Sequence, residues 1–140
     1  MQLCRVIKPK GNDMRQMGFG LDGDLHLHPE ETLFLVERCK LEVGNVSAPQ
    51  LYEAVDLHHY LAYTYFKQTS LIVFRAQPLR PPPGCHGPPV PPPPGIAFEA
   101  YAPSSKFSKT NPGRPIMYIM CGGYVHACVR TCVRGCLVMT

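Results

Sequence analysis

A proline-rich segment, PLRPPPGCHGPPVPPPPG from Pro78 to Gly95, divides the chain into two unlike halves. Proline has no amide hydrogen and fixes its own φ angle, so this segment favours polyproline II and does not form a helix or a central strand. At about 3.1 Å per residue, the segment would extend for roughly 50 Å. We therefore predict a first domain over residues 1–77, a linker over residues 78–95 and a separate region after the linker.

The composition of the whole chain is that of a folded protein. The 140 residues are 45% hydrophobic and 17% charged, with a formal net charge of +4, which is far from the profile of full disorder. Seven cysteines, an odd number, fit a reducing intracellular setting better than a disulfide framework. We see no signal peptide and no apolar run near the roughly 20 residues that span a bilayer, so we expect no membrane partner.

Residues 24–43 predict a strand, a helix and a second strand. In DLHLHP, leucine and histidine alternate, which places Leu25 and Leu27 on one face of a strand. Pro29 suits the first turn of a helix, where a missing N–H costs nothing, and the two glutamates after it suit the positive end of the helix dipole. The sequence KLEV at residues 40–43 alternates again and predicts a strand.

Three further elements precede the proline-rich segment. Ser47 and Gln50 have the spacing of a capping box, so we expect a helix to begin there. Helical patterning continues over residues 51–68 with a break near Asp56, and SLIVFRA at residues 70–76 is typical of a strand. Together these elements predict an α+β fold for the first half, with helices covering one face of a small antiparallel sheet.

Two histidines on the predicted strand, His26 and His28, would point to the same side and so could form a metal pair. No third ligand lies at a usual spacing, and we interpret both as surface histidines. Glu30 and Glu31 complement the helix dipole in this interpretation and are not an acid–base pair. We predict no metal site here.

The sequence GFGLDG, residues 18–23, matches the G-x-G-x-x-G fingerprint letter for letter. A dinucleotide site needs a strand before this motif and a helix after it, whereas here a polar stretch precedes it and a strand follows. We interpret the motif as a turn. No P-loop, nucleophile elbow or H-E-x-x-H motif is present, so we predict no catalytic residue and no cofactor.

The last residues, 122–140, have an unusual valine, cysteine and arginine texture. Three cysteines recur at every fourth position: Cys128, Cys132 and Cys136. Zinc sites usually contain C-x-x-C pairs and need a fourth ligand, for which His126 or Cys121 would have to serve. We interpret residues 122–140 as an unstructured or aberrant tail, with translation of non-coding sequence as the hypothesis for its origin.

Two sequence blocks lie on either side of the proline-rich segment. The first contains MGFGLDGDLHLHPEETLFLVERCKLEV and LYEAVDLHHYLAYTYFKQTSLIVFRA, and the second is IAFEAYAPSSKFSKTNPGRPIMYIM. They resemble, in the right order, the N-terminal region and the start of the endonuclease-like C-terminal domain of the non-catalytic "fifty-four" subunit family of the tRNA-splicing endonuclease. The matching residues of the first block are Pro29, Glu30, Glu31, Leu33, Phe34, Leu35, Glu37, Arg38, Tyr60, Tyr63, Lys67, Ile72, Val73 and Arg75. Those of the second are Phe98, Glu99, Tyr101, Phe107, Lys109, Asn111, Pro112, Gly113 and Pro115.

The resemblance implies a non-catalytic structural subunit that pairs with a catalytic subunit in the nucleus to remove introns from precursor tRNA. The catalytic subunits use a tyrosine, a histidine and a lysine. Tyr124 and His126 superficially resemble the neighbourhood of that histidine, but the preceding glycine-rich block and a following lysine are missing. We therefore expect no catalysis by this chain. Lys106, Lys109 and Arg114 flank the Asn-Pro-Gly turn and are candidate contacts to RNA or to a partner subunit.

The chain departs from the family pattern at three places, one of which is residues 67–73, where KQTSLIV replaces the family's usual Lys-Arg and Gly-Tyr. Cys39 stands where the family usually has glycine, so the helix end loses its easy left-handed turn. Similarity stops near Cys121, so residues 96–121 form only the start of an endonuclease-like α/β domain. A piece of about 25 residues does not bury a core by itself. We predict that residues 96–140 are poorly packed unless a partner completes them.

Two other hypotheses stay open at this point. The chain could be an adaptor that presents residues 78–95 as a polyproline II ligand to SH3, WW or profilin-like domains, since Arg80 precedes three prolines. The shortened protein could also assemble with no partner.

Overall fold

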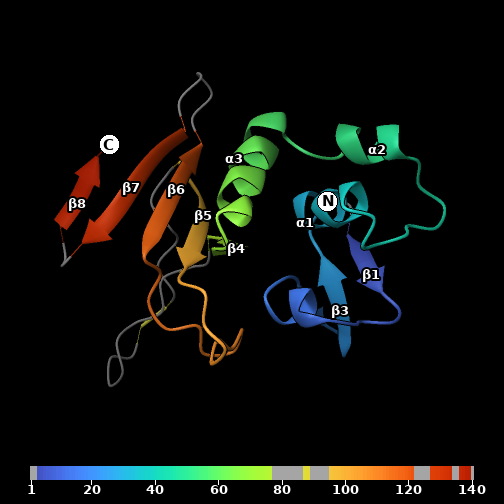
Figure 1. Ribbon diagram of the computed structural model, residues 1–140, viewed down its shortest axis with the longest axis horizontal. Coiled ribbons are helices and arrows are strands. Elements are labelled where there is room, and N and C mark those ends of the chain that lie inside the picture. Colours follow the sequence, from blue (N-terminus) through green and yellow to red (C-terminus); the bar gives the residue numbers. More distant parts are fainter. Residues whose placement is uncertain (1–2, 77–86, 89–94, 122–126, 134–135, 140) are drawn as a thin grey trace.

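The computed structural model of the chain describes residues 3–76, 87–88, 95–121, 127–133 and 136–139, and in the last two ranges only the backbone. The described residues form three α-helices, a short 3-10 helix and two antiparallel sheets (Figure 1). The elements in chain order are β1 (Cys4–Val6), η1 (Asn12–Arg15), β2 (Phe19–Leu21), β3 (Asp24–Leu27), α1 (Pro29–Glu37), α2 (Ala48–Glu53), α3 (Leu57–Gln68), β4 (Ile72–Arg75), β5 (Ile96–Tyr101), β6 (Met117–Cys121), β7 (Ala127–Val133) and β8 (Cys136–Met139). The α+β class predicted from the sequence is confirmed.

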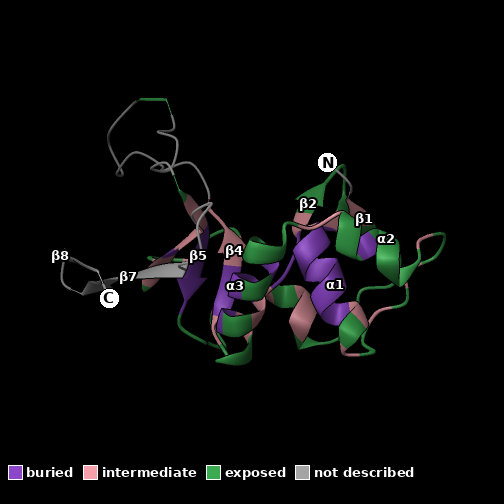
Figure 2. Ribbon diagram, turned by 90° about the horizontal axis from the view of Figure 1, so that it is seen from above, coloured by how far each residue is buried: buried purple, intermediate pink, exposed green. Residues whose placement is uncertain are grey.

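The two sheets lie on opposite sides of the helices. The small sheet has the order β1-β3-β2 and packs beside α1, whereas the large sheet has the order β4-β5-β6-β7-β8. Helix α3 lies between the large sheet and α1 (Figure 1). Burial is greatest along α1 and along the strands that face α3 (Figure 2).

Local signals in the first half are confirmed. Helix α1 begins at Pro29, and α2 follows Ser47, whose amide donates to the Gln50 side-chain oxygen at 2.8 Å. The break near Asp56 is the boundary before α3, where the Asp56 carboxylate accepts a hydrogen bond from the amide of His59. The strand predicted at residues 40–43 was wrong, because that segment is irregular and pairs with neither of the two sheets seen in the described ranges.

Strand β4 from the first half pairs directly with β5 from the second half. Arg75 lies opposite Phe98 in antiparallel register, and the Ala76 amide donates to the Ala97 carbonyl at 2.9 Å. The described residues that flank the proline-rich segment are therefore neighbours in one sheet. The division into residues 1–77, a linker over residues 78–95 and a region after it stays a prediction, to which the structure adds the β4–β5 pairing. Most of residues 78–95 lie outside the described part of the chain.

A single hydrophobic core extends across both halves. The Tyr63 ring of α3 lies 5.7 Å from the Phe34 ring of α1 and 5.7 Å from the Phe98 ring of β5, centroid to centroid. Phe98, Ala100 and Ile119 are at most 2% exposed. Poor packing, predicted for all of residues 96–140, is therefore not observed for β5 and β6, because α3 covers the face that such a short fragment would otherwise leave open.

The backbone of the last residues also differs from the prediction of an unstructured tail. Strand β7 pairs with β6, with Met117 opposite Thr131, and β8 pairs with β7. An edge strand without a neighbour would present unpaired amide and carbonyl groups, and β7, which contains two β-branched valines, pairs with these groups on β6. The origin of this sequence stays a hypothesis. No helix in the described ranges is long and apolar enough to cross a membrane.

The C-terminal end of α1 turns through a left-handed residue that is not glycine. Cys39 has a φ of 55°, its amide donates to the Val36 carbonyl, and the Lys40 amide donates to the Leu35 carbonyl. These two bonds form a Schellman motif, in which glycine is the usual left-handed residue. Cys39 therefore adopts the left-handed conformation, which costs more free energy for cysteine than for the glycine that is usual in the family.

We predict that Cys39→Gly stabilises the protein by about 0.5–1 kcal/mol. A left-handed non-glycine residue costs roughly 1–2 kcal/mol, and the greater unfolded-state freedom of glycine offsets about half of that cost. Chemical denaturation of the purified chain measures the change. Cys39→Ser is the matched control, since it removes the thiol without relieving the backbone; an equal gain in both variants would contradict the strain argument.

Candidate functional site

The first turn of α1 buries two consecutive carboxylates. Glu30 and Glu31 are only 4% and 2% exposed. One oxygen of Glu31 accepts from the Gly18 amide at 2.9 Å, and the other accepts from the His28 amide at 2.8 Å. Burial raises the pKa of Glu31, and these two hydrogen bonds oppose the rise. The predicted helix-dipole role is therefore only part of the explanation, because Glu31 also binds the loop before β2.

Glu30 forms a two-pronged ion pair with Arg75 of β4. The Arg75 Nε donates to Oε1 at 2.5 Å and Nη2 donates to Oε2 at 2.8 Å. Two parallel bonds from a guanidinium to a carboxylate are among the strong, geometrically specific contacts in proteins. The hydrogen bonds to Glu30 raise the pKa of Arg75. The pair joins α1 to β4 across 45 residues of sequence and leaves neither group available for chemistry.

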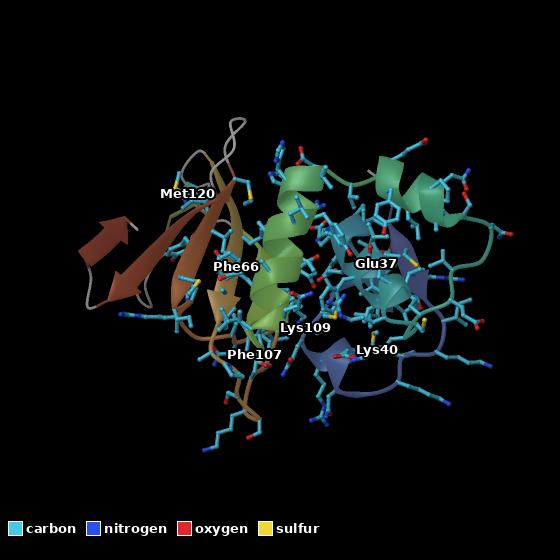
Figure 3. All side chains as sticks on the ribbon, turned by 45° about the horizontal axis from the view of Figure 1, so that its top comes forward. Glu37, Lys40, Phe66, Phe107, Lys109 and Met120 are labelled. Atoms are coloured by element: carbon cyan, nitrogen blue, oxygen red, sulfur yellow. The ribbon has the colours of Figure 1, made fainter. Side chains whose placement is uncertain are left out.

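Lys109, one of the three predicted contact residues, points into the protein (Figure 3). It belongs to the β5–β6 loop, residues 102–116. Its Nζ donates to the carbonyl of Met14 at 2.9 Å and to that of Met17 at 2.7 Å. Burial lowers the pKa of Lys109, opposed by the nearby Glu31 carboxylate. Lys109 thus fastens the β5–β6 loop to the region of η1.

The other two predicted contact residues, Lys106 and Arg114, are exposed. They line a shallow hollow in the β5–β6 loop together with Ser104 and Asn111. The loop is anchored by Phe107, whose ring stacks on Phe74 of β4 at 5.7 Å. Because residues 102–116 contain no acidic residue, the hollow presents cations and neutral polar groups to solvent. Contact of Lys106 and Arg114 with RNA or a partner stays a prediction.

The two histidines of the predicted surface pair have different surroundings. His26 is in β3, whereas His28 precedes α1 and packs with its ring centroid 4.6 Å from that of Phe19. His28 Nδ1 is buried and has no hydrogen-bond partner within the described residues. Among those residues, no group of three or more histidine, cysteine, aspartate or glutamate side chains is arranged to hold a metal ion.

The glycine-rich motif, predicted to be a turn, contains strand β2 and only ends in a turn. Asp22 and Gly23 both have positive φ, 52° and 83°, and connect β2 to β3 as a hairpin. Gly18 is required for a different reason, since a Cβ there would lie 2.6 Å from the His26 carbonyl oxygen. The close approach allows the Gly18 amide to reach Glu31.

Three features of the tail lie outside the part of the chain whose side chains are described: its cysteines, Tyr124 and His126.

Sequence analysis missed a buried polar pair in β5. Tyr101 donates to the Glu99 carboxylate at 2.8 Å, and burial together with Glu99 raises the pKa of Tyr101. Their spacing of two within one strand, which places both on the same face, was a signal that could have identified the pair.

One comparison with known protein families gives a match for the amino-terminal part of the chain. Residues 1–44 match the family described as tRNA-splicing endonuclease subunit sen54 N-term. The amino-terminal part of the chain is sen54-like. The matched region includes Gly18, Glu30 and Glu31, so the buried carboxylates lie within the sen54-like part, whereas Arg75 and Lys109 lie beyond it. No curated protein matches the chain.

We predict that Lys109→Met destabilises the protein by about 1.5–3 kcal/mol, since hydrogen bonds to charged groups contribute in that range. Lys106→Met is the matched control three residues away in the same loop, and a surface substitution of this kind changes stability by at most about 0.5 kcal/mol. Urea denaturation of both variants tests the difference. Equal stability of the two variants would show that the Lys109 bonds do not hold the loop.

The titration of His28 predicts a loss of stability in mild acid. Burial, and then the Arg75 cation, lower the pKa of His28 from 6.5 to about 4, while Glu30 opposes the change. Between pH 6.5 and about 4, the unfolded chain binds more protons than the folded chain. The free energy of unfolding therefore falls as the pH drops through this window and levels off below it, as far as His28 is concerned.

Denaturant titrations at pH 7, 5.5 and 4.5 measure this dependence. His28→Gln, which does not titrate, is the control, and we expect its stability to fall less steeply over the same window. Identical pH dependence in the two proteins would remove His28 as the cause.

Proposed function

We propose that the chain is a non-catalytic structural subunit of the tRNA-splicing endonuclease, which pairs with a catalytic subunit for intron removal from precursor tRNA in the nucleus. The match of residues 1–44 to the sen54 N-terminal family supports membership of such a complex. One structural observation supports the scaffold role. The charged residues of the recognisable motifs satisfy one another or the backbone inside the protein: Glu30 with Arg75, Glu31 with two amides, and Lys109 with two carbonyls.

Cleavage of a phosphodiester needs a base, an acid and a cation that converge on one phosphate. The buried glutamates already accept bonds from internal donors, and Lys109 already donates to internal acceptors. These groups are therefore suited to hold elements together. Lys106 and Arg114 are free to contact RNA or a partner, and we propose that role for them.

Co-expression with the catalytic subunit tests the proposal. We expect the tagged chain to retain the catalytic subunit through affinity and size-exclusion steps, and the purified chain alone to leave precursor tRNA uncut. Cleavage by the isolated chain, or failure to co-purify, would overturn the proposal.

A variant with residues 78–95 replaced by an equally long Gly/Ser sequence separates the scaffold from the adaptor hypothesis. The replacement leaves the β4–β5 pairing in place, so the core is unchanged. Retention of the catalytic subunit by this variant supports the scaffold. Loss of every partner would instead favour an adaptor that works through the proline-rich segment.

A further inference from the structure

Two loops that are far apart in the sequence meet at one end of the molecule. The N-terminal loop, residues 7–16, leaves β1 and contains η1; the β5–β6 loop lies beside η1 at the same end (Figure 1). The contact is made by Lys109, whose Nζ bonds span 95 residues to Met14 and 92 residues to Met17. The relative position of the two loops is therefore fixed by a specific interaction.

Most of the charged residues in the two loops are exposed cations. Lys8, Lys10 and Arg15 are exposed in the N-terminal loop, as Lys106 and Arg114 are in the β5–β6 loop. The one acidic residue of the two loops, Asp13, accepts from Lys40 Nζ at 2.8 Å and is neutralised by it. We name Lys8, Lys10, Arg15, Lys106 and Arg114 the basic surface. Because the two loops contain no other acidic residue, the basic surface has an excess of positive charge, which attracts polyanions.

We infer that the basic surface binds the phosphate backbone of RNA, with Lys109 as the positioning residue that holds its two loops together. The inference rests on the proposed function and extends it, since it assigns RNA contacts to the N-terminal loop. Three of the five cations are lysines, which are depleted in protein interfaces, whereas lysine, arginine, serine and asparagine all serve as phosphate contacts. Ser104 and Asn111 lie beside Lys106 and Arg114 in the hollow of the β5–β6 loop.

The surface predicts binding that does not depend on base sequence. Each cation that neutralises a phosphate releases counterions, so the logarithm of affinity falls with the logarithm of salt concentration by about 0.9 per duplex contact and about 0.7 per single-strand contact. Removing cations from either loop should therefore lower both the affinity and the salt slope.

Fluorescence anisotropy with a labelled precursor tRNA transcript, at several salt concentrations, tests the inference on the full chain. We compare Lys8→Ala/Lys10→Ala/Arg15→Ala with Lys106→Ala/Arg114→Ala. We expect each set to weaken binding at least several-fold and to reduce the salt slope by about one for each phosphate contact removed. An unchanged slope in either set would overturn the claim that both loops form one surface.

Two further comparisons address location and positioning. Arg5→Ala is the matched control for Arg15→Ala, because Arg5 is an exposed arginine of β1 that is already paired with Asp24 of β3. We expect only Arg15→Ala to lower the salt slope. Lys109→Met should weaken RNA binding, and Lys109→Arg, which can still donate to two carbonyls, should restore it. Equal RNA binding by the Met and Arg variants would remove Lys109 from this role.

The proposed function and this inference fail in distinguishable ways. Co-purification of each variant with the catalytic subunit reports on the proposed function, and the salt slope reports on the basic surface. Full assembly with an unchanged salt slope in both loop variants would reject the surface alone. Loss of assembly by the unaltered chain would reject the proposed function.

Discussion

The burial of two adjacent carboxylates at the start of α1 is the constraint on which the arrangement of the molecule depends. A buried charge without partners costs several kcal/mol, so each glutamate needs its own donors. Glu31 obtains them from the amides of Gly18 and His28, and Glu30 obtains them from Arg75. The first requirement positions the β2–β3 hairpin against the helix, and the second positions β4.

The position of β4 in turn determines where the second half of the chain lies. Strand β4 carries Arg75 and also offers its edge to β5, so the ion pair and the sheet share one element. Once β5 pairs with β4 and β6 pairs with β5, α3 covers their inner face and Phe98 lies in the core next to Tyr63. Lys109 adds a second connection between the halves, through its bonds to the carbonyls of Met14 and Met17. The two halves therefore form one packed unit in the described residues.

Local chemistry explains which features could be predicted from the sequence. Pro29, the Ser47–Gln50 capping box and the Asp56 cap each act within four residues. The helix starts at Pro29 and after Ser47 were predicted, as was a break near Asp56, although the cap itself was not. The strand at residues 40–43 failed because alternation alone does not supply a neighbouring strand. The strands β7 and β8 were not predicted, because β7 pairs with an edge that β6 provides. That edge is a property of the sheet and cannot be inferred from residues 122–140 alone.

The features that could not be predicted depend on which groups a charged side chain meets in the folded chain. These hydrogen-bond partners also determine which cations belong to the candidate site. Lys106 and Lys109 are three residues apart in one loop, and the sequence gives both the same charge and similar neighbours. Only the fold shows that Lys109 donates to carbonyls more than 90 residues away, while Lys106 faces solvent. The cations of this chain thus divide into those that are neutralised within the structure and those that are left outside. A scaffold needs the first group to keep its shape, and only the second group can bind another molecule, so the exposed cations are where recognition should be sought.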